Sequence, residues 1–284
     1  MRLPIYYLLA VLVAFSSRGE LFAADKRPID VIEDNSFLIE EAYNQEPGVV
    51  QHIFNAGYSA DSRACGWAFT FTQEWPVFSQ DHQFSFTIPS FHSRDGGKRV
   101  SGVGDILLNY RYQLLEEAEM KPAFAPRFSL ILPTGSRDQG TGDNVVGYQW
   151  NLPFSKKLGD RFAAHANLGL TYQPHVRALL DSSTGQLSPK RSLVSFNLGA
   201  SAIYAVLPRF HLMLEWVGNC DDGINDDGRR ERNFVPIIAP GFRAAVVNDE
   251  TLQIVIGAAA PIGLNRNAPN YGALLYLSFE HDLY

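Results

Sequence analysis

The stretch DRFAAHANLGLTYQ, residues Asp160 to Gln173, alternates between two kinds of side chain without a break. Every second residue is aliphatic or aromatic: Phe162, Ala164, Ala166, Leu168, Leu170 and Tyr172. The residues between them are small or polar: Ala163, His165, Asn167, Gly169 and Thr171. Because successive side chains of an extended chain point to opposite faces, the stretch predicts a β-strand with one apolar face.

The length of this strand indicates its surroundings. About eleven extended residues span roughly 36 Å, whereas strands of soluble sheets usually have only about 5–6 residues. A tilt near 45° reduces the span to about 26 Å, which matches the ~25 Å apolar band of an outer-membrane barrel. The apolar face is therefore expected to contact lipid and the polar face to line a lumen. A closed barrel also satisfies every backbone group where no water is available.

The same period of two recurs along the chain, which predicts about twelve long antiparallel strands. It is found in CGWAFTFTQEW, GDILLNYRYQ, AFAPRFSLIL, VVGYQWNLPF, LVSFNLGASAIY and RFHLMLEW. The connections alternate between short ones, such as KKLGD, LP and VNDE, and long ones, such as HVRALLDSSTGQLSPKR and NCDDGINDDGRRER. Tight periplasmic turns that alternate with longer extracellular loops are typical of outer-membrane barrels. We expect an all-β, transmembrane, up-and-down barrel over residues 48–284.

A secreted soluble sandwich or barrel is the alternative fold. Its solvated face would carry many lysines, but the lysines of this chain fall mainly in predicted turns and loops: Lys98, Lys121, Lys156, Lys157 and Lys190. Charged residues make up 19% of the chain, below the usual ~25% of soluble domains. The net charge of -6 gives no general attraction to nucleic acid. These features favour the membrane barrel.

The N-terminus predicts export. Arg2 precedes an apolar run from Ile5 to Phe15, which at about 11 residues suits a secretory signal and is too short for a transmembrane helix. We assign residues 1–24 to a signal peptide, with a buried N-terminal helix as the alternative. Residues 25–47 form a separate N-terminal segment before the barrel.

That N-terminal segment has two interpretations. In DNSFLIEEAYNQEPG, Asn35 or Ser36 could cap a short helix that ends before Pro47. The helix could be a periplasmic lead-in to the first strand. It could instead be a plug that folds into the lumen and uses the apolar face of Phe37, Leu38 and Tyr43.

The charges on inward-facing strand positions are the candidate site. By phase these residues face the lumen in its periplasmic half: Glu74, Arg111, Arg127, Arg243 and Glu280. They could pair with one another and fill a narrow interior. They could also form a constriction that selects a small solute, because charged rings set the selectivity of pores.

Other constellations give no defined chemistry. His165 and Asn167 share the inward face with Ser195 or Ser201, but nothing fixes a nucleophile within hydrogen-bond reach of the histidine. The acidic loop CDDGINDDG lacks the spacing of a calcium loop. The sequence therefore predicts no catalytic, cofactor-binding or metal-binding residue. Whether Cys65 and Cys220 form a disulfide is left open.

Several stretches resemble a known family. NSFLIEEAYNQEPGVVQHI, TQEWPV, GVGDILLNYRYQL, APRFSLILPTG and NLPFSKKLG are similar to a family of outer-membrane proteins named after a meta-cleavage pathway of phenol degradation. The resemblance covers most of the chain from about Asn35 onward. It implies an outer-membrane barrel linked to transport and supplies no catalytic residues.

Two classes of function follow from this fold. The first is a passive channel or transporter in the outer membrane for small molecules, hydrophobic or aromatic ones among them. The second is an outer-membrane enzyme or a structural anchor with a closed lumen, although we expect no enzymatic activity. The expected partners are outer-membrane lipid, the barrel-assembly machinery and a small-molecule solute.

Overall fold

The computed structural model describes residues 26–283 except 33, 63, 96–97 and 182. The predicted signal peptide, residues 1–24, lies outside the described residues. Among the described residues, no helix is both long enough and apolar enough to span a membrane.

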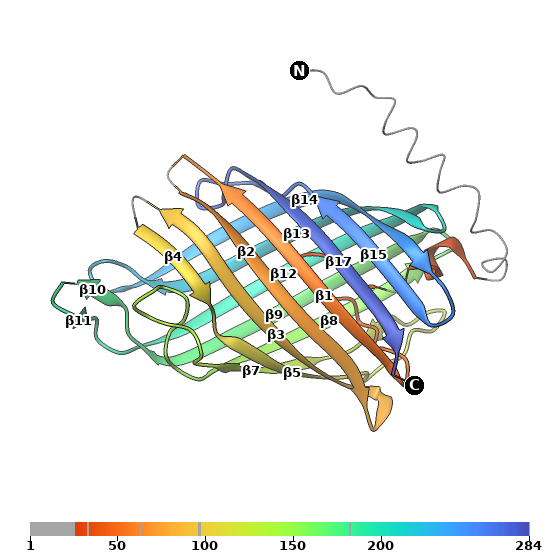
Figure 1. The fold of residues 1–284 in the computed structure, drawn as a ribbon, viewed down its shortest axis with the longest axis horizontal. Helices are drawn as coiled ribbons and strands as arrows, with labels where there is room; N and C mark the ends of the chain where they lie inside the picture. The colour runs from red at the N-terminus through yellow and green to blue at the C-terminus, as the bar shows by residue number, and fades with distance from the viewer. Residues whose placement is uncertain (1–25, 33, 63, 96–97, 182, 284) are drawn as a thin grey trace, which may run out of the picture.

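Twelve antiparallel strands follow one another round a closed barrel (Figure 1). They are β1 (Val49–Ala60), β2 (Ala64–Val77), β3 (Ser79–Asp95), β5 (Ile106–Tyr112), β7 (Arg127–Leu132), β8 (Gly147–Leu158), β9 (Phe162–Val176), β12 (Arg191–Leu207), β13 (Phe210–Ile224), β14 (Arg230–Asn248), β15 (Leu252–Ala259) and β17 (Tyr271–Asp282). The barrel closes where β1 pairs with β17, from Val49 opposite Asp282 to Ala60 opposite Tyr271. The predicted fold and strand number are confirmed.

Five short strands lie outside this cycle. They are β4 (Lys98–Val103), β6 (Ala123–Phe124), β10 (Leu179–Asp181), β11 (Gln186–Leu187) and β16 (Ile262–Gly263). Strands β10 and β11 form a separate hairpin within the connection from β9 to β12, at the left end in Figure 1. The C-terminus lies at the opposite end, beside the short turns of the barrel (Figure 1).

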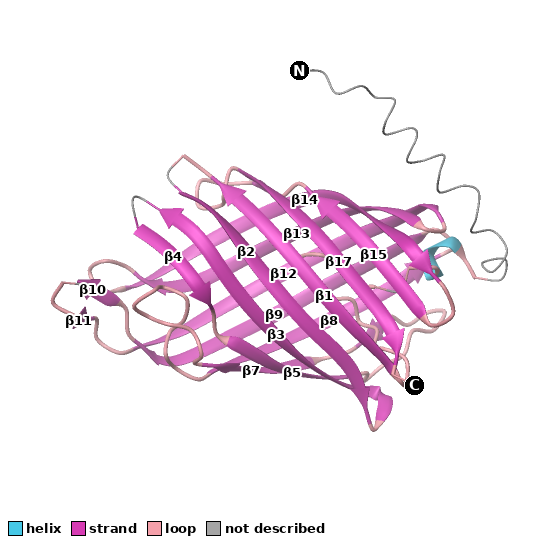
Figure 2. Cartoon of the chain, viewed as in Figure 1, coloured by secondary structure: helices cyan, strands magenta, loops and turns pink. Residues whose placement is uncertain are grey.

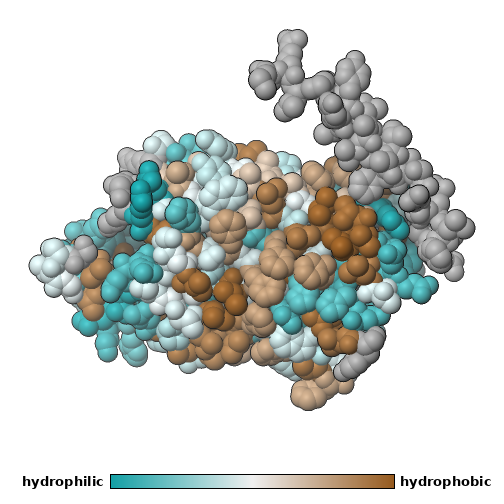
Figure 3. Space-filling model, in the orientation of Figure 1, coloured by the Kyte–Doolittle hydropathy of each residue, from teal (hydrophilic) through white to brown (hydrophobic). Residues whose placement is uncertain are grey.

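The two faces of the wall follow the predicted alternation. In β9, Leu168 is 51% exposed, whereas its neighbour Asn167 is 3% exposed. Large hydrophobic residues are exposed on strands all round the barrel, among them Phe54, Phe69, Leu198, Leu214 and Leu275. In Figure 3 such residues form large patches on the visible side wall.

Many polar side chains are buried inside the barrel. Gln51, Gln83, Ser129, Ser155 and Glu215 are all at most 2% exposed. A soluble sandwich would bury its apolar face and expose its polar face. This barrel does the reverse, which suits a wall surrounded by lipid.

The helix expected after Asn35 is absent. Among the described residues the only helix is the 3-10 turn η1 (Pro28–Asp30), drawn in cyan in Figure 2. The chain from Asn35 to Gln45 contains bends but no helix. The prediction of a short capped helix is therefore wrong, and contacts in the lumen explain why.

Candidate functional site

Residues 26–32 and 34–47, hereafter the inserted segment, enter the barrel before β1 begins. Ile29, Ile32 and Phe37 belong to one buried apolar cluster together with wall residues that include Ile53, Ile203, Val255 and Tyr276. The ring centroids of Phe37 and Tyr276 are 4.9 Å apart. These contacts place the segment within the lumen.

Two wall glycines allow the segment to lie close to the strands. A Cβ atom at Gly199 would collide with Cγ2 of Ile39, and one at Gly257 would collide with the ring of Phe37. A wall residue with any side chain would push the segment away at these positions.

Wall side chains satisfy the backbone of the inserted segment. Glu215 on β13 accepts hydrogen bonds from the N–H groups of Phe37 (3.3 Å) and Leu38 (2.9 Å). Four further N–H groups of the segment donate in the same way: Glu40 to Asn167, Ala42 to Ser155, Asn44 to Gln113, and Gln45 to Gln83. Because these N–H groups bind the wall, they make no i to i-4 bonds, and the chain from Asn35 to Gln45 has no helix.

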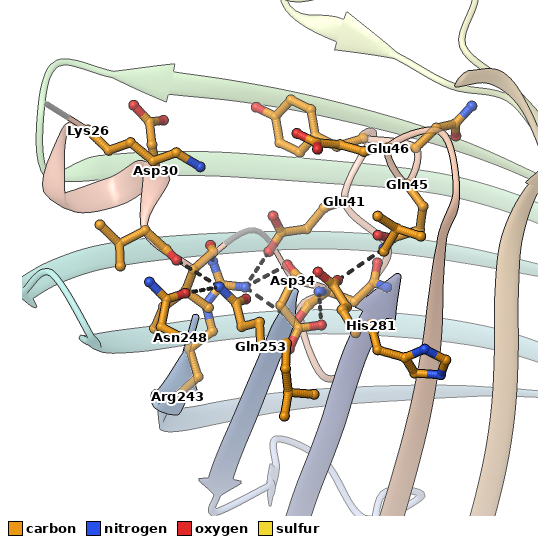
Figure 4. Close-up of a pocket in the computed structure, with 18 of the residues that line it drawn as sticks. Lys26, Asp30, Asp34, Glu41, Gln45, Glu46, Arg243, Asn248, Gln253 and His281 are labelled. Atoms are coloured by element: carbon orange, nitrogen blue, oxygen red, sulfur yellow. Dashed lines mark hydrogen bonds and ion pairs between the residues drawn. The ribbon is translucent and has the colours of Figure 1, made fainter. Parts of the chain in front are cut away.

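Two arginines of the wall bind carboxylates of the segment. Arg243 is 2% exposed, and its Nη1 lies 2.9 Å from Oε1 of Glu41 and 2.7 Å from the carbonyl oxygen of Asp34 (Figure 4). On the other side of the lumen, Nη2 of Arg127 lies 2.6 Å from Oε1 of Glu40. Such charge-assisted bonds are about twice as strong as neutral ones.

Asp34 adds a polar contact to the closing strands. Its Oδ1 accepts a hydrogen bond from Nε2 of Gln51 on β1 at 2.6 Å and another from the hydroxyl of Tyr276 on β17. The segment therefore binds the wall on both sides of the barrel seam.

All five residues of the predicted constriction face the lumen, but they do not form one ring. Within the set, Nη2 of Arg111 and Oε2 of Glu74 form an ion pair at 3.9 Å. Arg111 also donates to Asn44 Oδ1 and to the carbonyl oxygen of Tyr43. Glu280 accepts a hydrogen bond from Gln45 at 3.2 Å.

The sequence analysis did not identify the residues that bind the five predicted constriction residues, or the carboxylate of β13 that binds the segment. Asp34, Glu40 and Glu41 come from the inserted segment, and Glu215 comes from an inward position of β13. The alternating phase of RFHLMLEW could have shown that Glu215 is a buried inward carboxylate in need of a donor. The three acidic residues of the segment gave no such signal, because their position inside the barrel cannot be inferred from local pattern.

The periplasmic turn between β5 and β6 also contacts the segment. Glu117 accepts a hydrogen bond from the hydroxyl of Tyr43 at 2.7 Å and one from Nζ of Lys156 at 2.9 Å. Burial raises the pKa of Glu117, but the hydrogen bonds from Lys156, Tyr43 and the Lys157 N–H outweigh it and hold that pKa below its usual value. Glu117 is therefore an anionic anchor for Tyr43.

Cavities lie on both sides of the inserted segment. The periplasmic one has a volume of about 910 Å³ and is lined by residues of the segment and of the β14–β15 turn (Figure 4). The second, hereafter the vestibule, has a volume of about 510 Å³ and extends toward the extracellular ends of the strands. Asn35 lines both cavities. The segment thus separates two spaces of one lumen.

The vestibule is rich in amide and hydroxyl groups. Its lining includes Asn55, Asn109, Asn151, Asn197, Thr87 and Thr171. Oδ1 of Asn55 and Oδ1 of Asn151 are buried and have no hydrogen-bond partner within the described residues. Ile39, Leu107 and Tyr276 add apolar surface. The space can therefore receive a molecule with both a ring and a hydrogen-bonding group.

His165 has a different serine partner from those considered in the sequence. Its Nδ1 lies 2.7 Å from Oγ of Ser155, and its Nε2 lies 3.6 Å from Oε2 of Glu41. Ser155 is only 1% exposed and its hydroxyl accepts the N–H of Ala42. A substrate cannot reach this hydroxyl while the segment is in place, so these residues anchor the segment.

The acidic loop and the two cysteines form no metal site among the described residues. No cluster of three or more His, Cys, Asp or Glu residues suited to a metal ion occurs in the part of the chain that the structure describes. In the acidic loop, Asp222 pairs with Arg232 at 2.7 Å and with Arg230 at 3.6 Å. Cys65 and Cys220 are both free thiols.

Comparison with known proteins agrees with the sequence motifs. Residues 48–174 match the profile of the family described as "Putative MetA-pathway of phenol degradation". The family resemblance is confirmed. The matched part covers β1 to most of β9, and the inserted segment precedes it. None of the curated proteins matches this chain.

Solved structures share the barrel. An outer membrane channel from Pseudomonas putida F1 aligns with a TM-score of 0.67 and 14% identity, over 87% of this chain and 99% of that chain. The NanC porin aligns with a TM-score of 0.49 and 10% identity, over 82% of this chain and 100% of that chain. At these identities the first likeness shows a shared outer-membrane barrel fold.

Proposed function

We propose that this chain is a passive outer-membrane channel for small molecules, in which the inserted segment forms the constriction. The observation that carries the proposal is a closed barrel whose lumen has a cavity on each side of that segment. A protein that used the barrel only as an anchor would need neither cavity. The outer membrane channel from Pseudomonas putida F1, which shares the fold, supports the same class of function.

The segment can move without breaking the barrel. The strand ladder is complete without it, because β1 pairs with β17 along twelve residue pairs. The segment contributes no strand and binds the wall through side chains and the apolar cluster. Displacement of the segment would therefore break these contacts but no hydrogen bond between strands of the wall. A solute could then pass between the two cavities.

The wall charges then determine how firmly the constriction holds. Arg127, Arg243 and Arg111 bind the segment directly, Glu280 binds it through Gln45, and Glu74 faces Arg111. In this proposal the five residues act with the segment and not as a ring of their own. The charges of Glu74 and Arg127, which line the vestibule, also set its ion preference.

A small aromatic molecule that carries a hydroxyl group is the solute we propose. The description of the matching family names phenol degradation, which supports this class. The vestibule offers Ile39, Leu107 and Tyr276 to a ring, and amide and hydroxyl groups such as those of Asn197 and Thr171 to a hydroxyl group. Its volume of about 510 Å³ falls within the range of about 300–1,000 Å³ typical of ligand pockets.

Two measurements on the purified full chain test the proposal. In planar bilayers the protein should give discrete conductance steps, and in liposomes it should admit phenol faster than protein-free controls and faster than a sugar. Because phenol also crosses bilayers unaided, the rate must rise with the number of barrels per liposome. Absence of both conductance and barrel-dependent uptake would establish the closed-lumen anchor instead.

A further inference from the structure

Two histidines face each other on the outer wall, across the seam that closes the barrel. His52 lies on β1 and His281 lies on β17, and their Nε2 atoms are 3.2 Å apart. Their ring planes differ by 17°. In Figure 4 the ring of His281 points away from the cluster around Asp34 and Arg243. His281 also lines the periplasmic cavity, but its ring lies apart from that cluster of charges.

The position of one proton is fixed by a backbone group. Nδ1 of His281 lies 2.9 Å from the carbonyl oxygen of Asp282. A carbonyl can only accept, so Nδ1 carries the hydrogen and the neutral ring has its lone pair on Nε2. Metal-binding histidines typically have this arrangement, in which the other ring nitrogen donates to a carbonyl or carboxylate.

The spacing of the two nitrogen atoms suits a single metal ion. Two Zn–N bonds of about 2.0–2.1 Å at the tetrahedral angle place the nitrogens about 3.3–3.4 Å apart. The observed separation of 3.2 Å requires almost no movement. Phe279 and Phe71 pack beside His52, with ring centroids 4.8 Å and 6.2 Å away, and restrict its rotation.

We propose that His52 and His281 bind a divalent transition-metal ion, of the class of Zn²⁺, Ni²⁺ or Cu²⁺, on the outer wall at the periplasmic end of the seam. Imidazole nitrogen is a preferred ligand of these ions. Water would occupy the other coordination positions, since both histidines are only partly buried. The ion would join the first and last strands of the barrel and so stabilise its closure.

Titration calorimetry on the folded full chain, without an affinity tag, tests this site. Zn²⁺ should bind at one ion per barrel, and His52→Ala and His281→Ala should each weaken binding by at least about 10-fold. His82→Ala is the matched control, because His82 is another partly buried wall histidine, and its Nδ1 lies 2.6 Å from the hydroxyl of Tyr110. That variant should bind Zn²⁺ as the wild type does.

Two further readouts distinguish this site from others. Cu²⁺ bound to the wild-type barrel should show coupling to two nitrogens by electron paramagnetic resonance, and Zn²⁺ should raise the unfolding temperature of the wild type but not of His281→Ala. Heat-modifiable mobility in detergent gels confirms that each variant is folded. An undetectable affinity for all three ions, or an affinity unchanged in both variants, would overturn the proposal. Neither result bears on the channel function.

Discussion

Replacing Arg243 by methionine should release the inserted segment. The guanidinium of Arg243 donates to Glu41 Oε1 and to the carbonyl oxygens of Asp34 and Ile32, at 2.7 to 3.2 Å. Methionine keeps much of the side-chain volume but removes every one of these donors. The carboxylate of Glu41, which is 5% exposed, would then keep only the hydroxyl of Ser36 and the ring of His165 as neighbours.

The expected size of the effect follows from burial. Removing one partner of a buried ion pair costs roughly 3–5 kcal/mol, because the other charge is left without compensation. Each 1.36 kcal/mol is a factor of ten in an equilibrium constant, so the population with a displaced segment should rise by about 100- to 5,000-fold. The wall is unaffected, because its strand ladder does not involve the guanidinium of Arg243.

Single-channel recording measures this change as open probability or mean conductance. Arg266→Met, in the exposed loop before β17, is the matched control and should behave as the wild type. In the double variant with Glu41→Gln, the effects should be less than additive, with a coupling of about 0.5–3 kcal/mol. A folded Arg243→Met barrel with wild-type open probability and conductance would refute the reasoning.

Three further changes probe other parts of the structure. Arg127→Ala should shift ion selectivity toward cations, measured as reversal potential in a salt gradient, and leave assembly intact, because it exposes the unpaired Glu40 in the lumen. Leu168→Arg places a charge on the lipid face at mid-strand and should destabilise the barrel by roughly 2–4 kcal/mol in urea unfolding, whereas Leu168→Phe should not. Acid should loosen the segment through Glu117. The pKa of Glu117 is lower in the folded protein than in the unfolded chain. Its carboxylate therefore stabilises the bound segment fully above the unfolded pKa, near 4.5, and this stabilisation is lost as the pH falls through the pKa of the folded protein. Conductance should therefore rise as the pH falls from 4.5 through the lowered pKa of Glu117, and Glu117→Gln should show that higher conductance already at neutral pH.

The wall of this barrel could be predicted from sequence because its signal is local. Strict alternation in stretches such as Phe162 to Tyr172 reports which side chain faces lipid, and one register is compatible with it. The same alternation placed Arg111, Arg127 and Arg243 on the inward face. The structure agrees, with Arg111 3% exposed and Arg243 2% exposed.

The partners of these arginines could not be predicted in the same way. Glu41 lies 202 residues from Arg243 in sequence, and Glu40 lies 87 residues from Arg127. Local pattern around Glu40 and Glu41 favoured a helix, because a helix is the usual way to satisfy successive N–H groups. Here Glu215, Asn167 and Ser155 of the wall satisfy them, and no periodicity within the segment encodes that.

The central claim is that passage through the barrel depends on movement of the inserted segment. A disulfide between Ser36→Cys and Ser201→Cys can hold the segment against β12, because the two hydroxyl oxygens are 3.3 Å apart and both side chains are buried. Cys65→Ser and Cys220→Ser remove the two free thiols of the background. We predict that the oxidised, cross-linked barrel conducts far less than the same molecules after reduction. Equal conductance in the two states, with the cross-link verified by mass spectrometry, would contradict the account.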